Sequence, residues 1–228
     1  MAVDASGWLH KSVYTCALDL GTDARPWGDG VPPYVEYCCR LLDMMRACGV
    51  RPVVVFDGGQ FPLKREENAK RTAARKANLA KAKMRHAKGD VAGAEALFQA
   101  AVSVTPAMAR DLLYACRARG VETLVAPYEA DTQMAFLAKA PPDHPMHVAA
   151  VVTEDSDMLA YGCPCVVFKM SRTGDAQQVC FEDVLRGTIV ADDAGPVPLF
   201  QGFDHHQLLV ACVLAGCDWL ASVHGMGI

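Results

Sequence analysis

The hydrophobic and polar positions along the chain follow two different periods in turn. Short apolar runs rich in β-branched residues lie at residues 1–4, 52–56, 123–126 and 148–153, and they predict buried strands. Between these runs, apolar residues recur at helical spacing over residues 7–20, 34–48, 106–119 and 129–138. Strands that alternate with helices in this way indicate one α/β domain, built around a mostly parallel twisted sheet that helices flank.

Further elements are expected outside this alternation. Residues 64–88 contain no Gly or Pro and favour one long helix, and Asp90 can cap a second helix that runs to about Ala101. After the fourth strand we expect a short helix near 157–161, strands at 166–170 and 178–181, a loop over 186–203 and a helix over 205–215.

Composition narrows the class of protein. The chain is 52% hydrophobic and 21% charged, with a mean hydropathy of +0.12, so it can bury a core and is not disordered as a whole. Its longest apolar run, Leu208–Cys217, is too short to cross a bilayer, and the N-terminus lacks the layout of a signal peptide. The ten cysteines form no C-x-x-C pair, so we expect reduced, mostly buried thiols and no zinc site. These features indicate a soluble intracellular protein without a membrane partner.

Positive charge is concentrated in one segment. Residues 64–88 hold ten of the 22 Lys and Arg residues and only two acids, although the net charge of the chain is −4. A solvated helix face would explain most such runs, but the one-sided sign also suits an element that contacts phosphates. The acidic remainder needs its own explanation, because acidic surfaces repel nucleic acid unless metal ions neutralise them.

Each of the four apolar runs ends in carboxylates. The carboxyl ends of parallel strands share one edge of a sheet, so these side chains are expected to converge there. Glu154 is left out, because strand alternation places it on the side opposite to Asp155. The converging residues are Asp4, Asp57, Glu129, Asp131, Asp155 and Asp157, and Asp218 can join them from outside the sheet.

Such a cluster of acids predicts bound cations. Like charges raise one another's pKa and destabilise the fold unless something offsets them. Oxygen ligands without Cys or His suit Mg²⁺ or Mn²⁺, and two such ions can promote phosphodiester hydrolysis. A lone Asp after a strand is more often a helix cap or a turn residue, but the same feature on four strands favours a metal centre.

The acidic motifs also carry a family resemblance. VVVFDG, VAPYEADTQMAFL, VVTEDSDMLAYG and LAGCDWL resemble, in this order, motifs of the flap endonuclease and exonuclease 1 family of structure-specific 5′ nucleases. AVDASGWLHK resembles the first acidic motif of that family, so the resemblance extends from Ala2 to Ile228. APYEAD and the stretch from KANLAKAK to MARDLL are similar to the exonuclease 1 branch. Alternatives are a flap endonuclease or Holliday-junction resolvase of the same family, or a catalytically impaired DNA-binding relative. A generic nucleotide-binding domain is disfavoured, because no G-x-G-x-x-G or G-x-x-x-x-G-K-[ST] motif follows a strand.

The resemblance implies an activity and a set of partners. The chain would be a metal-dependent 5′→3′ exonuclease on double-stranded DNA with 5′-flap endonuclease activity, acting in mismatch repair and recombination in the nucleus. Its substrates would be duplexes with 5′ ends, nicks or 5′ flaps. Two Mg²⁺ ions, which Mn²⁺ can replace, would be held by Asp4, Asp57, Glu129, Asp131, Asp155, Asp157 and Asp218.

The resemblance also assigns catalytic and DNA-binding residues. Lys64 and Arg71 would reach the scissile phosphate, and their seven-residue spacing places them on one helix face. Without the resemblance, His10 is as readily a packed core histidine, and Tyr14 either stacks on a base or belongs to the core. The implied catalytic residues are Lys64, Arg71, Asp57 and Asp155. The implied DNA-binding residues are His10, Lys11, Lys64, Arg71, Arg75, Lys76, Lys81, Lys83, Gly225 and Gly227.

The family pattern divides the chain into four regions. These are an N-terminal nuclease region at 1–63, a basic helical arch at 64–104, an internal nuclease region at 105–204, and the start of a helix–two-turn–helix element at 205–228 that binds DNA and can hold K⁺. The chain lacks the family's opening Met-Gly-Ile-x-Gly-Leu segment and the tail that binds mismatch-repair proteins. We therefore expect it to be the nuclease core of a longer protein, or the product of an incomplete gene model.

Overall fold

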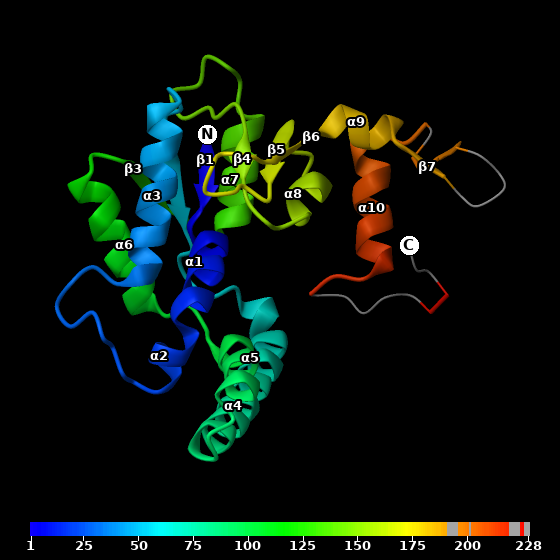
Figure 1. The fold of residues 1–228 in the computed structure, drawn as a ribbon. Helices are drawn as coiled ribbons and strands as arrows, with labels where there is room; N and C mark the ends of the chain where they lie inside the picture. The colour runs from blue at the N-terminus through cyan, green and yellow to red at the C-terminus, as the bar shows by residue number, and fades with distance from the viewer. Residues whose placement is uncertain (191–195, 201, 219–223, 226–228) are drawn as a thin grey trace.

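A six-stranded sheet lies at the centre of the fold, which a computed structural model describes over residues 1–190, 196–200, 202–218 and 224–225 (Figure 1). The strands lie in the order β3-β2-β1-β4-β5-β6, and all neighbouring pairs are parallel except β5 and β6. The predicted mostly parallel α/β sheet is confirmed. The strand bounds are β1 Ala2–Asp4, β2 Val53–Phe56, β3 Glu122–Val125, β4 Val151–Val152, β5 Cys165–Phe168 and β6 Gln177–Cys180.

Successive residues of the central strands enter two separate cores. Val3 and Val54 belong to one hydrophobic cluster, whereas Ala2 and Val55 belong to another on the opposite face of the sheet. Because both faces are buried, the strands are apolar throughout rather than alternating with polar residues. The first face is covered by α1 (Ala5–Val13), α3 (Pro33–Ala47) and α6 (Pro106–Ala118), and the second by α7 (Ala130–Lys139) and α8 (Asp157–Ala160).

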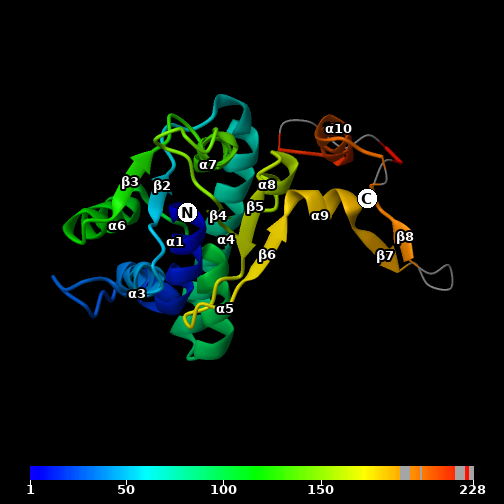
Figure 2. The ribbon, with the colours of Figure 1, turned by 90° about the horizontal axis from the view of Figure 1, so that it is seen from above.

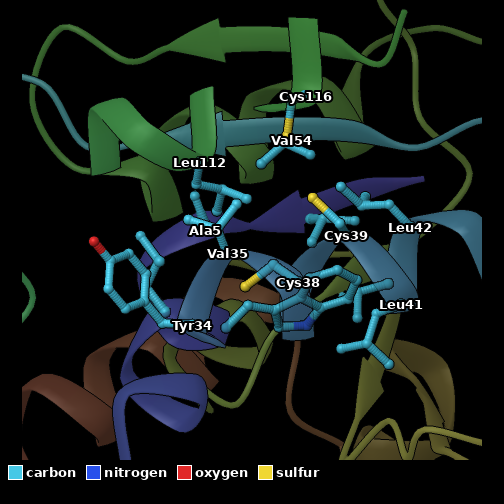
Figure 3. Close-up of a cluster of buried hydrophobic side chains, with 14 of the residues drawn as sticks. Ala5, Tyr34, Val35, Cys38, Cys39, Leu41, Leu42, Val54, Leu112 and Cys116 are labelled. Atoms are coloured by element: carbon cyan, nitrogen blue, oxygen red, sulfur yellow. The ribbon is translucent and has the colours of Figure 1, made fainter. Parts of the chain in front are cut away.

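Cysteines contribute to the first core. Figure 3 shows Cys38 and Cys39 of α3 and Cys116 of α6 among the side chains of this cluster, which also includes Leu112. All ten cysteines are free, which confirms the expected reduced thiols, but only five of them are buried. No helix in the described part of the chain is both long and apolar enough to cross a membrane.

The basic segment forms a helical hairpin that projects from the sheet (Figures 1 and 2). Its helices are α4 (Arg65–Ala87) and α5 (Val91–Ala101), and the Asp90 side chain caps α5 by accepting from the Gly93 N–H at 2.9 Å. The buried ring of Phe98 joins the hairpin to α2 (Ala17–Gly21) in a small core of its own. Gly21 permits this contact, since a Cβ there would lie 2.1 Å from the Phe98 ring.

Two local predictions need correction. The helix expected over 7–20 is interrupted, because α1 ends at Val13 and a 3-10 turn, η1 (Tyr14–Cys16), precedes α2. The loop expected over 186–203 is also wrong, since Thr188–Val190 (β7) and Pro196–Pro198 (β8) form an antiparallel pair, while residues 191–195 and 201 lie outside the described residues. β8 is hard to recognise from the sequence, because its prolines argue against a strand. Proline is tolerated in edge strands, and both strands of this pair are edge strands.

Three further helical elements lie outside the sheet and the hairpin. They are η2 (Pro62–Lys64) before α4, α9 (Phe181–Arg186) after β6, and α10 (His205–Ala215). Asp204 and Gln207 form a reciprocal capping box at the start of α10. His205 fixes this helix against α8, because its Nε2 lies 2.8 Å from the backbone oxygen of Ala160. The contact matters for the site, since α8 begins at Asp157 and α10 leads to Asp218.

Candidate active site

The seven carboxylates that the sequence analysis assigned as metal ligands line one pocket of about 700 Å³, and Glu154 lines it as an eighth. Asp4 ends β1, Asp57 follows β2, and the remaining acids follow β3, β4 and α10. The residues are Asp4, Asp57, Glu129, Asp131, Asp155, Asp157 and Asp218, which is the complete set predicted from the sequence. They meet because the carboxyl ends of neighbouring parallel strands open on the same edge of the sheet.

The negative charges of the pocket carboxylates are only partly balanced by positive charges. Burial, together with the nearby charges of Asp4 and Asp155, raises the pKa of Asp131 to about 8. Burial also raises the pKa of Asp4, which is only 7% exposed, and of Asp157, where the Asp155 charge adds to the effect. These shifts mean that the folded protein holds negative charge at a cost that a bound cation would relieve.

Two cations of the helical hairpin enter the pocket. The Lys64 Nζ lies 2.9 Å from Glu129 Oε1 and 3.0 Å from Asp218 Oδ2. Burial lowers the pKa of Lys64, but its hydrogen bonds to these carboxylates outweigh burial and hold the pKa above the ordinary lysine value. Arg71 pairs with Glu67 on its own helix and reaches Asp218 Oδ1 at 3.5 Å. The prediction that both cations face the same way is confirmed, because both line the pocket.

The acids are held in place by groups that the sequence analysis did not single out. Asp57 accepts a hydrogen bond from the Ala130 N–H at 2.8 Å and another from the Ser6 hydroxyl. Thr153 contacts both Asp4 and the backbone of Asp155. Ser6 and Thr153 lie two residues from Asp4 and Asp155, so a search for hydroxyls near each acid in the sequence would have found them.

An aromatic pair stands at the edge of the pocket. The rings of Phe61 and Tyr128 meet edge to face with centroids 5.6 Å apart, and both residues line the pocket. Tyr128 is half exposed, so part of its side chain is open to solvent at the edge of the pocket. Its position directly before Glu129, within the APYEAD motif, is the signal from which it could have been predicted.

Some of the predicted DNA-binding residues line the pocket and others lie outside it. His10 lines the pocket and is not among the residues of the hydrophobic core. Burial lowers its pKa, and the positive charge of the nearby Arg75 lowers it further. Lys11 lies outside the pocket wall, with its Nζ 3.3 Å from Glu154 Oε1 and 3.1 Å from the Met170 backbone oxygen.

The other predicted contacts lie farther from the acids. Arg75, Lys76, Lys81 and Lys83 lie along α4, and none of them lines the pocket. Tyr14 is 46% exposed and therefore does not belong to the core. Gly225 occupies a turn with φ of 83°, and Gly227 lies outside the described residues. Their roles in DNA binding stay predictions.

The donor set fits a hard divalent cation, although the carboxylates are not gathered around one point. Within the described ranges of the chain, no three His, Cys, Asp or Glu side chains are grouped closely enough to hold a metal ion. The Lys64 ammonium lies between two of the acids and supplies part of the missing positive charge. Carboxylate oxygens without Cys or His are the ligands that Mg²⁺ and Mn²⁺ prefer.

Comparison with known proteins gives consistent results. Exonuclease 1 of Danio rerio is 39% identical over the whole chain, which corresponds to 26% of the relative's length, and exonuclease 1 of Arabidopsis thaliana is 36% identical over 29% of its length. The chain thus spans less than a third of these relatives. Among solved structures, the catalytic core of Rad2 in complex with a DNA substrate is similar in fold, with a TM-score of 0.57 and 22% sequence identity. The match covers the whole of this chain and 57% of the Rad2 chain.

Two family domains account for most of the sequence. The XPG N-terminal domain matches residues 1–78, which include Asp4, Asp57, Lys64 and Arg71. The XPG I-region matches residues 120–218, which carry the other five acids that the sequence analysis assigned as metal ligands. The order of the acidic motifs, the sheet that brings them together and both domain matches agree, and the chain belongs to the XPG family.

Proposed function

We propose that this chain is the nuclease core of a metal-dependent 5′→3′ exonuclease that acts on double-stranded DNA and also cleaves 5′ flaps. The observation that carries the proposal is the convergence of seven carboxylates and two cationic side chains on one open pocket. Similarity to exonuclease 1 across the whole chain supports the exonuclease assignment over a flap endonuclease or a junction resolvase.

The carboxylates are proposed to hold two Mg²⁺ ions, for which Mn²⁺ can substitute. When bound, such ions activate a water molecule and stabilise the leaving oxygen of a phosphodiester. The seven acids would be the ligands, and Ala130 N–H, Ser6 and Thr153 would hold three of them in orientation. A K⁺ ion near the turn at Gly225 belongs to the same proposal.

The two pocket cations are proposed to act on the phosphate. Lys64 and Arg71 now neutralise Glu129 and Asp218, and both line the pocket in which a phosphate would bind. Once metal ions compensate the acids, these cations become available to stabilise negative charge that develops on the phosphate during hydrolysis. We therefore propose that these two cations take part in catalysis and do not only attract the DNA.

The outer cations of α4 are proposed to bind the DNA backbone. Lys76, Lys81 and Lys83 are exposed and lie outside the pocket, as suits side chains that contact phosphates without taking part in the reaction. A role in mismatch repair and recombination, in the nucleus and with mismatch-repair proteins as partners, is part of the proposal and is supported by the similarity to exonuclease 1.

A cleavage assay with a defined label tests the proposal. Duplexes with 5′-recessed ends, nicks or 5′ flaps would be incubated with Mg²⁺ or with EDTA, and the products would be sized. We expect stepwise shortening from the 5′ end and excision of flaps in Mg²⁺, no cleavage in EDTA, and none by the variant with Asp155→Asn and Asp157→Asn. Preference for flaps or four-way junctions over duplex ends would favour the alternatives within the family. DNA binding by the folded protein without any Mg²⁺-dependent cleavage would contradict the proposal.

A further inference from the structure

A buried hydroxyl connects two of the pocket acids. Thr153 follows β4 and is 2% exposed, although it lies beside the open pocket and does not line it. Its hydroxyl Oγ1 lies 3.0 Å from Asp4 Oδ2, and the backbone nitrogen of Asp155 lies 3.1 Å from the same Oγ1. One side chain therefore contacts an acid of β1 and the backbone of an acid that follows β4.

The direction of both hydrogen bonds follows from chemistry. The backbone N–H of Asp155 can only donate, so the Thr153 oxygen accepts from it. The hydroxyl has one proton, which it donates to Asp4 Oδ2. Asp4, which lines the pocket, also accepts hydrogen bonds from the backbone of Gly7 and Ser6, so Thr153 is the side chain among three groups that hold this carboxylate.

The chain of hydrogen bonds continues to a third acid. The Asp157 N–H donates to Asp155 Oδ1 at 2.8 Å, so the position of Asp155 also influences the start of α8. The Thr153 backbone is itself fixed, because its N–H donates to the Val167 oxygen of β5 at 3.1 Å. Thr153 thus links the acids to the rigid centre of the sheet.

We propose that Thr153 is a positioning residue that sets the arrangement of Asp4 and Asp155 for divalent metal binding. This inference rests on the proposed function, because it concerns the same pocket. Groups that orient metal ligands commonly change metal affinity by about 10–100-fold when they are removed. A buried hydroxyl with a purely structural role would change stability instead and leave metal affinity alone.

A set of matched variants separates the two roles. Thr153→Val keeps the shape of the side chain but removes the hydroxyl, and Thr153→Ser keeps the hydroxyl but removes a methyl group. Ser12→Ala is the control, because Ser12 is also fully buried, donates to the Leu9 backbone oxygen and contacts none of the acids. Thr153→Ala serves as a second hydroxyl deletion if the valine variant does not fold.

The readout is Mn²⁺ binding by the DNA-free protein, measured by electron paramagnetic resonance, with unfolding temperature measured in EDTA. We expect Thr153→Val to weaken Mn²⁺ binding about 10–100-fold, and Thr153→Ser and Ser12→Ala to stay within about threefold of the parent. The positioning role would be refuted if folded Thr153→Val bound Mn²⁺ with unchanged affinity, or if the serine and valine variants lost Mn²⁺ affinity equally. Neither result would bear on the proposed function. Absence of Mn²⁺ binding by the parent protein would overturn the proposed function and, with it, this inference.

Discussion

Replacing Asp131 with Asn should stabilise the metal-free protein. Asp131 has a partly buried carboxylate whose pKa is raised to about 8, first by burial and then by the neighbouring acids Asp4, Asp155, Asp57 and Glu129. A raised pKa means that the folded state binds a proton more tightly than the unfolded state. The charged carboxylate therefore lowers stability progressively as pH rises from about 4 to about 8.

The size of the effect follows from the shift. One pKa unit corresponds to about 1.4 kcal/mol, so the shift from 3.8 to about 8 sets an upper bound of about 6 kcal/mol. Asp131 is not fully buried, and water that reaches it reduces this value. We expect Asp131→Asn to raise the free energy of unfolding by about 2–3 kcal/mol at about pH 8.5 in EDTA, and by less than half as much at about pH 5.5.

Thermal unfolding followed by circular dichroism would measure both effects. A gain of about 2–3 kcal/mol corresponds to a rise in Tm of about 5–10 °C for a protein of this size. Mg²⁺ should raise the Tm of the parent more than that of the variant, because the variant has lost a proposed ligand. Asp143→Asn is the control, since Asp143 is exposed and does not line the pocket. A lower Tm for Asp131→Asn in EDTA, or a gain independent of pH, would refute the reasoning.

Other variants test the helical hairpin. Lys64→Ala with Arg71→Ala should lower the cleavage rate by about 100-fold or more while DNA affinity changes little, and a rate that follows affinity alone would argue against a catalytic role. Lys81→Ala with Lys83→Ala should weaken DNA binding and reduce its salt slope by about 0.9 per contact, and an unchanged slope would contradict these contacts. Phe98→Ala removes a buried ring worth about 3–5 kcal/mol and should speed hydrogen exchange in α4 and α5 but not in the sheet. Equal acceleration throughout the protein would show that the hairpin does not open separately.

Much of the fold could be predicted because its central strands are buried on both faces. Val53–Phe56 forms an unbroken apolar run that ends directly before Asp57, so the sequence displays both the strand and the acid at its end. The position of each acid then follows from the geometry of parallel strands. β7 and β8 are not detectable in this way, because both are short and lie outside the main sheet, and β8 contains two prolines.

The contacts within the site depend on distances that the sequence does not contain. Lys64 pairs with Asp218, which is 154 positions away in the chain, because the end of η2 and the segment after α10 reach the same pocket. Glu154 was expected on the side opposite to Asp155, but it lines the same pocket, where its Oε1 lies 3.3 Å from Lys11 Nζ. Strand periodicity gives the side on which a residue lies within a strand, but the partner depends on how separate helices pack.

The central claim is that the seven acids hold two divalent metal ions, and anomalous diffraction from crystals grown with Mn²⁺ tests it most directly. The account predicts two anomalous peaks within the pocket that Asp4, Asp57, Glu129, Asp131, Asp155, Asp157 and Asp218 line, and a loss of occupancy in crystals of the variant with Asp155→Ala and Asp157→Ala. Well-diffracting crystals that show no peak in this pocket at saturating Mn²⁺, or the same peaks in the variant, would contradict it.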